Sequence, residues 1–116
     1  MIDTLERLKQ WGCDITGSLP RFLEDQEFML DCIVEVSEDP AFETLGEALM
    51  QNNTEKAFEA AHTLKGILAN TGLTPLTEII VTIVEPLRRG NGEGLMQPYA
   101  ALIQKRKELL DLLHKQ

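Results

Sequence analysis

Apolar residues recur at intervals of three and four positions along most of the chain, and this spacing predicts a succession of amphipathic α-helices. Glycine, proline and asparagine residues separate the apolar runs and mark the points where helices are expected to end. The predicted helices and helical turns span residues 2–11, 18–24, 26–36, 42–50, 54–69, 74–89 and 95–114. The pattern therefore predicts an all-α protein.

Threonine and proline residues set several of the expected boundaries. Thr54 and Thr74 are predicted to be N-caps, because a threonine hydroxyl can accept a hydrogen bond from a free amide of the first helical turn. Pro75 then falls in a first turn, where proline loses no backbone hydrogen bond. We expect Pro40 to break the chain between two helices and Pro86 to distort a last turn.

The length and composition fit one helical domain. The chain has 116 residues, of which 43% are hydrophobic and 5% aromatic, and this size supports a single core. Short connections between successive helices favour antiparallel neighbours. We therefore predict an antiparallel, up-down-up-down four-helix bundle with a short N-terminal helical cap, formed by one domain over residues 1–116.

Charge and hydropathy narrow the classes of partner. The net charge of −8 argues against nucleic acid, because phosphate backbones are bound by clustered Lys and Arg. Basic residues nevertheless gather locally at Lys65, Arg88 and Arg89, and residues 105–107 form a run that we expect to be a solvated helix face. No apolar run reaches the roughly 18 residues of a membrane span, so we expect a cytoplasmic protein without a membrane partner. The initial methionine favours a separate protein over a segment of a hybrid kinase.

The cysteines and one histidine have structural interpretations. Cys13 and Cys32 lie in apolar surroundings without CxxC spacing, which predicts buried, reduced thiols and no metal site. His114 falls in the last turn of the final helix, where it is expected to be solvated or to cap the helix. The remaining histidine, His62, is the candidate for chemistry.

The helix over residues 54–69 directs His62 away from the core. At 100° per residue, the residues within roughly 40° of one direction define a buried face, which comprises Ala57, Ala61, Leu64, Leu68 and Thr71. His62 lies about 140° from this direction. Gly66 and Ala69 share its outer side, and Lys65 lies at the edge.

The neighbours of His62 suggest phosphoryl transfer. An interior glycine costs a helix about 1 kcal/mol relative to alanine, so Gly66, one turn after His62, suggests close approach by another molecule. Lys65 is within side-chain reach of His62 and could hold an anion attached to the imidazole. An outward nucleophile, a cation and a cleared surface suit a reaction that depends on positioning and charge neutralisation.

The motif around His62 resembles a known family. Residues 61–66 read Ala-His-Thr-Leu-Lys-Gly, which is similar to the H-x-L-K-G core of histidine-containing phosphotransfer (HPt) domains, and residues 69–73 resemble its A-N-x-G continuation. Residues 25–30 are similar to the acidic and aromatic entry to the family's second helix, and Arg88 aligns with a basic residue of many members. The family's apolar spacing is matched by Leu76, Ile80, Ile83 and Leu87. The likeness covers most of the chain, and its most specific part is residues 61–72.

The resemblance implies a four-helix bundle in which His62 accepts a phosphoryl group from a receiver-domain aspartate and passes it to another receiver. Lys65 would stabilise the phosphoryl oxygens, and Gly66 would admit the receiver. The implied docking residues are Gly66, Ala69, Phe58, Glu59 and Arg88. The partners would be response-regulator receiver domains and a hybrid histidine kinase. The chain would be a monomeric phosphocarrier without ATP-dependent kinase activity and without a cofactor, and the magnesium would belong to the receiver.

The sequence departs from the family at Val84, where many members have a Glu or Gln that hydrogen-bonds the imidazole. This contact is either missing or supplied by a neighbour such as Glu85. Two other functions stay open. A helical adaptor could keep the fold without phosphorylation, although the retention of both His62 and Lys65 disfavours it. An enzyme with His62 as a general base would need an orienting carboxylate and a pocket.

Overall fold

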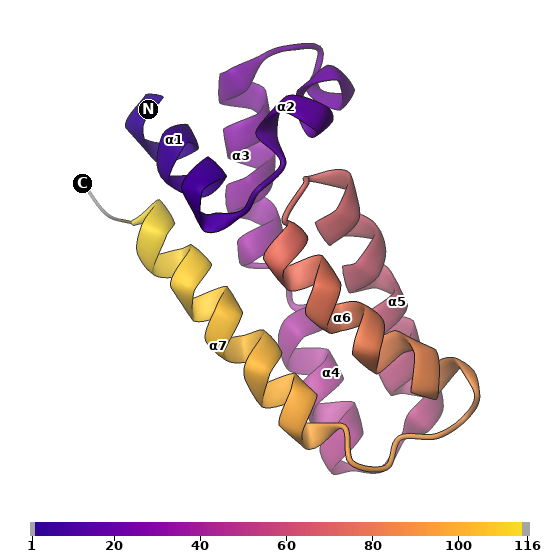
Figure 1. The fold of residues 1–116 in the computed structure, drawn as a ribbon. Coiled ribbons are helices and arrows are strands. Elements are labelled where there is room, and N and C mark those ends of the chain that lie inside the picture. The colour runs from indigo at the N-terminus through magenta and orange to yellow at the C-terminus, as the bar shows by residue number, and fades with distance from the viewer. Residues whose placement is uncertain (1, 115–116) are drawn as a thin grey trace.

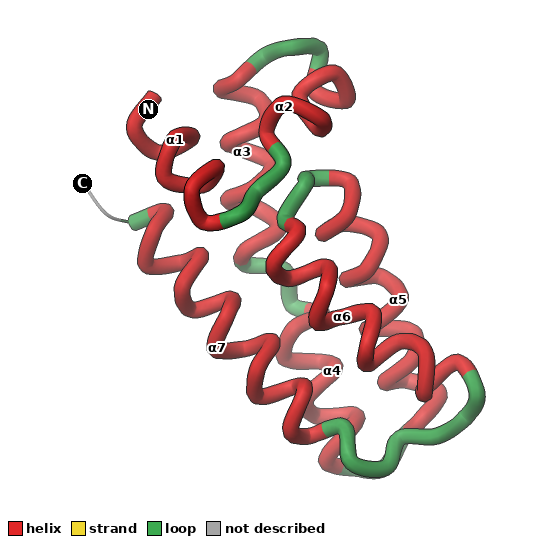
Figure 2. Tube along the Cα trace, viewed as in Figure 1, coloured by secondary structure: helices red, strands yellow, loops and turns green. Residues whose placement is uncertain are grey.

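The computed structural model describes residues 2–114, and every regular element in this range is helical (Figure 2). Four helices run alternately up and down, so that consecutive helices are antiparallel (Figure 1). Their bounds are α4 (Ala41–Met50), α5 (Thr54–Asn70), α6 (Thr74–Arg88) and α7 (Met96–Leu113). The predicted all-α antiparallel bundle is confirmed.

Four further elements extend the bundle at one end. Helix α3 (Gln26–Ser37) precedes α4 and lies end to end with it, and the break predicted at Pro40 separates the two (Figure 1). The N-terminal cap consists of α1 (Ile2–Trp11), α2 (Ile15–Ser18) and the 3-10 turn η1 (Leu19–Phe22). The short helix α2 was not predicted, and the turn expected over 18–24 is the shorter η1.

Both predicted N-caps, Thr54 and Thr74, are wrong by one residue. Asn53 caps α5, because its Oδ1 accepts a hydrogen bond from Lys56 N at 3.1 Å, and Thr54 is the first helical residue. Helix α6 likewise begins at Thr74, and Leu73 occupies the cap position without a side-chain hydrogen bond. An asparagine immediately before a threonine competes for the same free amides.

The core is apolar and draws on all of the long helices. The face predicted for α5 is buried as expected, and its small residues Ala57 and Ala61 allow neighbouring helices to approach closely. The largest fully buried side chains are Phe42, Leu8, Met29, Ile33, Leu45, Leu64, Leu68, Leu73, Leu76, Ile80, Ile83 and Leu102. Burial of this kind stabilises the fold by about 1.5–3 kcal/mol for each large side chain.

A close contact joins α4 to α7. The Tyr99 hydroxyl donates a hydrogen bond to Phe42 O at 2.9 Å. A Cβ at Gly46 would overlap the Tyr99 ring and hydroxyl, so this position of α4 requires glycine. Burial, with a contribution from the nearby Glu43 carboxylate, raises the pKa of Tyr99, and the phenol remains a donor at neutral pH.

The basic run over residues 105–107 is not the uniformly solvated face that was predicted. Arg106 Nε donates to Ser37 O at 2.8 Å, and Arg106 Nη1 pairs with Glu43 Oε2 at 2.8 Å. The guanidinium lies 4.5 Å from the centroid of the Phe42 ring. Arg106 therefore joins α7 to α3 and α4, because helix packing covers its side of α7.

The N-terminal cap is tied to the bundle by polar contacts. Trp11 Nε1 donates to Glu108 Oε1 at 3.1 Å, and the hydrogen bonds from Trp11 and Lys105 lower the pKa of Glu108. Arg21 Nε donates to Asn70 O at 3.0 Å and satisfies a free carbonyl at the end of α5. The segment before α3 thus holds the helix that carries His62.

The two cysteines differ in their surroundings. Cys13 is buried as predicted, and burial together with the Asp14 carboxylate raises the pKa of its thiol to about 12. Cys32 is only partly buried, so the prediction is wrong for this residue, which faces a surface groove between α3 and α5. None of the helices within residues 2–114 has the length and apolar character needed to cross a membrane.

Candidate functional site

His62 projects from the outer side of α5, as the helical geometry predicted. Phe58, one turn earlier, stacks against it with ring centroids 5.5 Å apart and planes inclined by 20°. Among the described residues, the imidazole has no hydrogen-bonding side-chain partner. The His62 side chain is exposed, and the stacked phenyl ring restricts the orientation of the imidazole.

Charged side chains from two helices surround this aromatic pair. Lys65 Nζ lies 3.9 Å from Glu85 Oε2, and Arg88 Nε lies 3.7 Å from Glu85 Oε1. The Arg88 guanidinium also lies 5.4 Å from the centroid of the Phe58 ring, at cation–π distance. Packing of α6 on α5 thus places two cations and one carboxylate beside His62.

Val84 does not contribute to this group, because its side chain is fully buried in the core. Glu85 was the neighbour considered as a substitute for the imidazole contact. Its carboxylate instead faces Lys65 and Arg88, and the structure gives it no hydrogen bond to His62. The contact that the structure gives the imidazole is its stacking on Phe58.

Gly66 is exposed one turn after His62. A Cβ added at this position would meet no atom within 4 Å, so packing inside the protein does not require a glycine here. Ala69 is also exposed on the same side. The small residues leave the surface next to His62 free of bulky side chains, as predicted.

A groove of about 460 Å³ begins at Gly66 and lies between α5 and α3. Its lining is mainly apolar, with the Glu35 carboxylate as its one charged group. The lining residues are Phe22, Cys32, Glu35, Val36, Gly66, Ile67, Asn70 and Thr71. The contribution of α3 and η1 was not predicted, because nothing in the local spacing shows which helix lies beside α5.

The remaining predicted docking residues divide between the two sides of α5. Phe58 and Arg88 belong to the group around His62. Glu59 is exposed on the side that faces α4, where it borders a hollow with Lys56 and Thr63. The structure therefore does not bring Glu59 together with Lys65 and Arg88.

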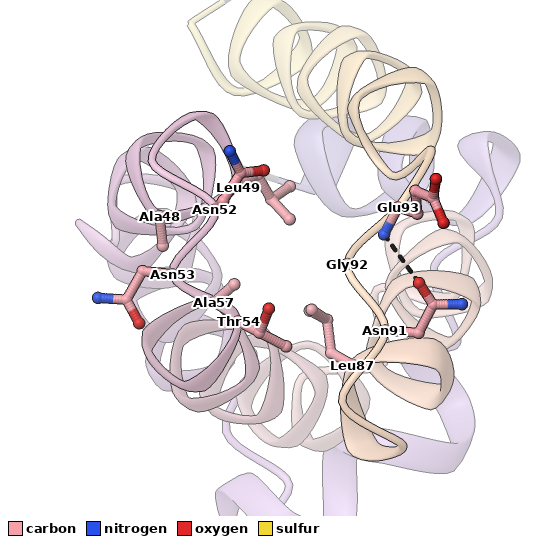
Figure 3. A pocket seen from close by; sticks show the side chains of 10 residues that line it. All are labelled: Ala48, Leu49, Asn52, Asn53, Thr54, Ala57, Leu87, Asn91, Gly92 and Glu93. Carbon is pink, nitrogen blue, oxygen red and sulfur yellow. Dashed lines mark hydrogen bonds between the residues drawn. The ribbon is translucent and has the colours of Figure 1, made fainter.

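A second hollow, of about 220 Å³, lies at the end of the bundle where α5 begins (Figure 3). Two of its polar side chains accept hydrogen bonds from the local backbone. Asn53 caps α5, and Asn91 Oδ1 accepts a hydrogen bond from Glu93 N at 3.0 Å, shown as the dashed line. Nowhere in the described part of the chain do three His, Cys, Asp or Glu side chains gather as metal ligands.

The family model of the Hpt domain matches residues 27–116. The chain belongs to the Hpt domain family. Comparisons with curated proteins and with solved structures give no match. Membership of the Hpt family implies a general role in histidine phosphotransfer within a phosphorelay, with receiver domains as the class of partner. Both histidines of this Hpt domain lie in the matched region and are exposed, and His62 is the one within the H-x-L-K-G motif. The N-terminal cap lies outside the match.

Proposed function

We propose that this Hpt domain is a phosphorelay intermediate in which His62 accepts a phosphoryl group from a receiver aspartate and passes it to a second receiver. The supporting observation is the arrangement around His62. An exposed imidazole, held by stacking on Phe58, lies beside Lys65 and Arg88, and Gly66 leaves its approach open. No other described histidine has such neighbours.

The proposed step is an exchange of one bond for another. A neutral imidazole nitrogen of His62 attacks the phosphorus of the aspartyl phosphate, so that a P–N bond forms while the P–O bond breaks. The receiver carboxylate leaves with the electron pair, and the imidazole then releases a proton to solvent. Transfer to the second receiver reverses these events. The exchange requires no ATP, so the proposed activity is that of a phosphocarrier and not of a kinase.

The two cations suit the product of this step. A phosphoryl group on His62 carries up to two negative charges, and charge-assisted hydrogen bonds from Lys or Arg stabilise such an anion. Lys65 is three residues after His62 on the same helix face, and Arg88 reaches the same region across Phe58. In the proposal, both bind phosphoryl oxygens, and magnesium is contributed by the receiver.

The docking surface is proposed to comprise Gly66, Ala69 and the groove between α3 and α5. An apolar groove that adjoins the nucleophile can hold a receiver while its aspartate reaches His62. Response-regulator receivers, and the receiver of a hybrid histidine kinase, are the proposed partners. The monomeric state and the cytoplasmic location expected from the sequence stay predictions.

Incubation with a pre-phosphorylated receiver tests the proposal. Acid-labile label should appear on His62, where mass spectrometry can locate it, and His62→Gln should abolish labelling. The matched control is His114→Gln, because His114 is the other histidine and is exposed at the end of α7. Lys65→Ala should slow transfer by about ten-fold, as expected for the loss of a charged hydrogen bond, with an unchanged helical circular dichroism spectrum.

Label of undiminished intensity on the His62→Gln protein would disprove the assignment. Wild-type rates and phosphohistidine lifetime in Lys65→Ala would remove Lys65 from the proposed role. Tight binding of receivers without any transfer to the wild-type protein would indicate a helical adaptor instead.

A further inference from the structure

Glu85 occupies the position between the two cations that the proposed function assigns to the phosphoryl group. One carboxylate oxygen faces Lys65 at 3.9 Å and the other faces Arg88 at 3.7 Å. The Glu85 side chain is 44% exposed, and those of Lys65 and Arg88 are 37% and 46% exposed. Ion pairs this long and this exposed are weak and can exchange partners.

The same two cations belong to the neighbourhood of His62. Lys65 follows it by three residues on α5, and Arg88 lies over the Phe58 ring that stacks on the imidazole. A second anion bound to His62 would therefore compete with Glu85 for both partners. A phosphoryl dianion carries more charge than a carboxylate and offers three acceptor oxygens, so it is the stronger competitor.

We propose that Glu85 is a resident counter-ion, which pairs with Lys65 and Arg88 while His62 is unmodified and is displaced from them when His62 carries a phosphoryl group. The inference rests on the proposed function. Glu85 is a positioning residue in this account, because it acts through the two cations and does not touch the transferred group. Its carboxylate remains nearby after displacement and repels the phosphoryl group. Glu85 thereby limits the stability of the phosphohistidine and favours onward transfer.

A counter-ion role and an imidazole-orienting role of Glu85 predict opposite effects of its substitution on phosphorylation of His62. An orienting contact predicts that loss of Glu85 impairs phosphorylation, with Gln as a partial substitute. A counter-ion predicts that Glu85→Gln and Glu85→Ala both favour the phosphorylated form, because both remove the competing charge.

The test compares these variants with Glu78→Gln. Glu78 is exposed on α6, about two turns before Glu85, and no described ion pair includes it. The first measurement is the equilibrium distribution of the phosphoryl group between a receiver and His62. Both Glu85 variants should shift it toward phosphohistidine by about two- to ten-fold, the range expected from two weak ion pairs, and Glu78→Gln should shift it by less than two-fold.

The second measurement needs no transfer. Inorganic phosphate is titrated into the unmodified protein, and the amide resonances of Lys65 and Arg88 are followed by NMR. Phosphate should half-saturate the Glu85 variants at a concentration about two-fold or more below that of the wild-type protein, and adding Lys65→Ala should remove this gain.

The outcomes separate the two proposals. Absence of transfer in every variant, with the phosphate gain present, would refute the proposed function and leave the counter-ion role standing. Unchanged phosphate binding in both Glu85 variants would overturn the counter-ion inference, even if the wild-type protein transfers normally. A phosphohistidine equilibrium that falls in Glu85→Ala and is retained in Glu85→Gln would show that Glu85 orients the imidazole.

Discussion

At the scale of single residues, Gly66 lowers the stability of its helix and keeps the surface near His62 open. Glycine inside a helix costs about 0.5–1 kcal/mol relative to alanine. Packing around Gly66 does not require a glycine, since an added Cβ would meet no atom within 4 Å. Gly46 differs, because the Tyr99 ring fills the space where its side chain would lie. Packing therefore does not explain the glycine near His62, and we propose that it leaves room for a partner.

Gly66→Gln should therefore raise stability and lower function. Helix propensity should increase the free energy of unfolding by several tenths of a kcal/mol, while the side chain obstructs a receiver that approaches His62. Thermal unfolding and the rate of transfer from a phosphorylated receiver are measured on the same protein. Ala101→Gln, at an exposed position of α7, controls for added bulk and should leave transfer unchanged. A destabilised Gly66 variant with a wild-type transfer rate would contradict this account of the surface.

At the scale of helices, Arg106 adds polar contacts between α7 and both α3 and α4. The guanidinium combines a hydrogen bond to Ser37 O, an ion pair with Glu43 and a position over the Phe42 ring. Its side chain is only 16% exposed, so these contacts are less screened than those of a surface arginine. The adjacent Lys107 is exposed and takes no part. One basic run therefore contains a structural residue and a solvated one.

Arg106→Ala is expected to lower the free energy of unfolding by about 1–3 kcal/mol, because it leaves the Ser37 carbonyl without its donor and uncovers Phe42. The midpoint of urea or thermal unfolding measures the change. Lys107→Ala is the matched control and should stay within about 0.5 kcal/mol of the wild-type protein. Equal effects of the two substitutions would show that the Arg106 contacts contribute nothing to stability.

At the scale of the whole molecule, the folded unit extends beyond the part that matches the Hpt family. The match begins at residue 27, whereas the core includes Leu5, Leu8 and Phe22 from the N-terminal cap. Arg21 also satisfies the carbonyl of Asn70 at the end of the helix that carries His62. We propose on these grounds that residues 1–116 form a single domain.

Removal of residues 1–25 should destabilise the bundle by several kcal/mol, since each large apolar side chain contributes about 1.5–3 kcal/mol on burial. The unfolding midpoints of the truncated and full chains give the difference. Within the full chain, Leu8→Ala should cost about 2–5 kcal/mol, and Leu23→Ala should cost little because Leu23 is 83% exposed. A truncated chain with the full chain's midpoint and cooperativity would show that the cap is not part of the domain.

Features that depend on neighbours in the chain could be predicted from the sequence alone. The period of apolar residues located the long helices, and rotation by 100° per residue identified both the buried face of α5 and the outward position of His62. Residues 61–66 carried the resemblance to the family that the match over residues 27–116 confirms. Helix geometry and side-chain size are local properties, so these conclusions needed no knowledge of the fold.

Features that depend on residues far apart in the chain were decided by the tertiary structure. Nothing in the sequence indicated that Glu85 lies near Lys65, that Arg106 reaches Ser37, or that α3 forms one wall of the groove beside Gly66. Each contact joins separate helices, and its geometry depends on how those helices rotate and slide against one another as the core packs. The apolar pattern determines which face of a helix is buried, and only the packed bundle determines which polar side chains meet at its surface.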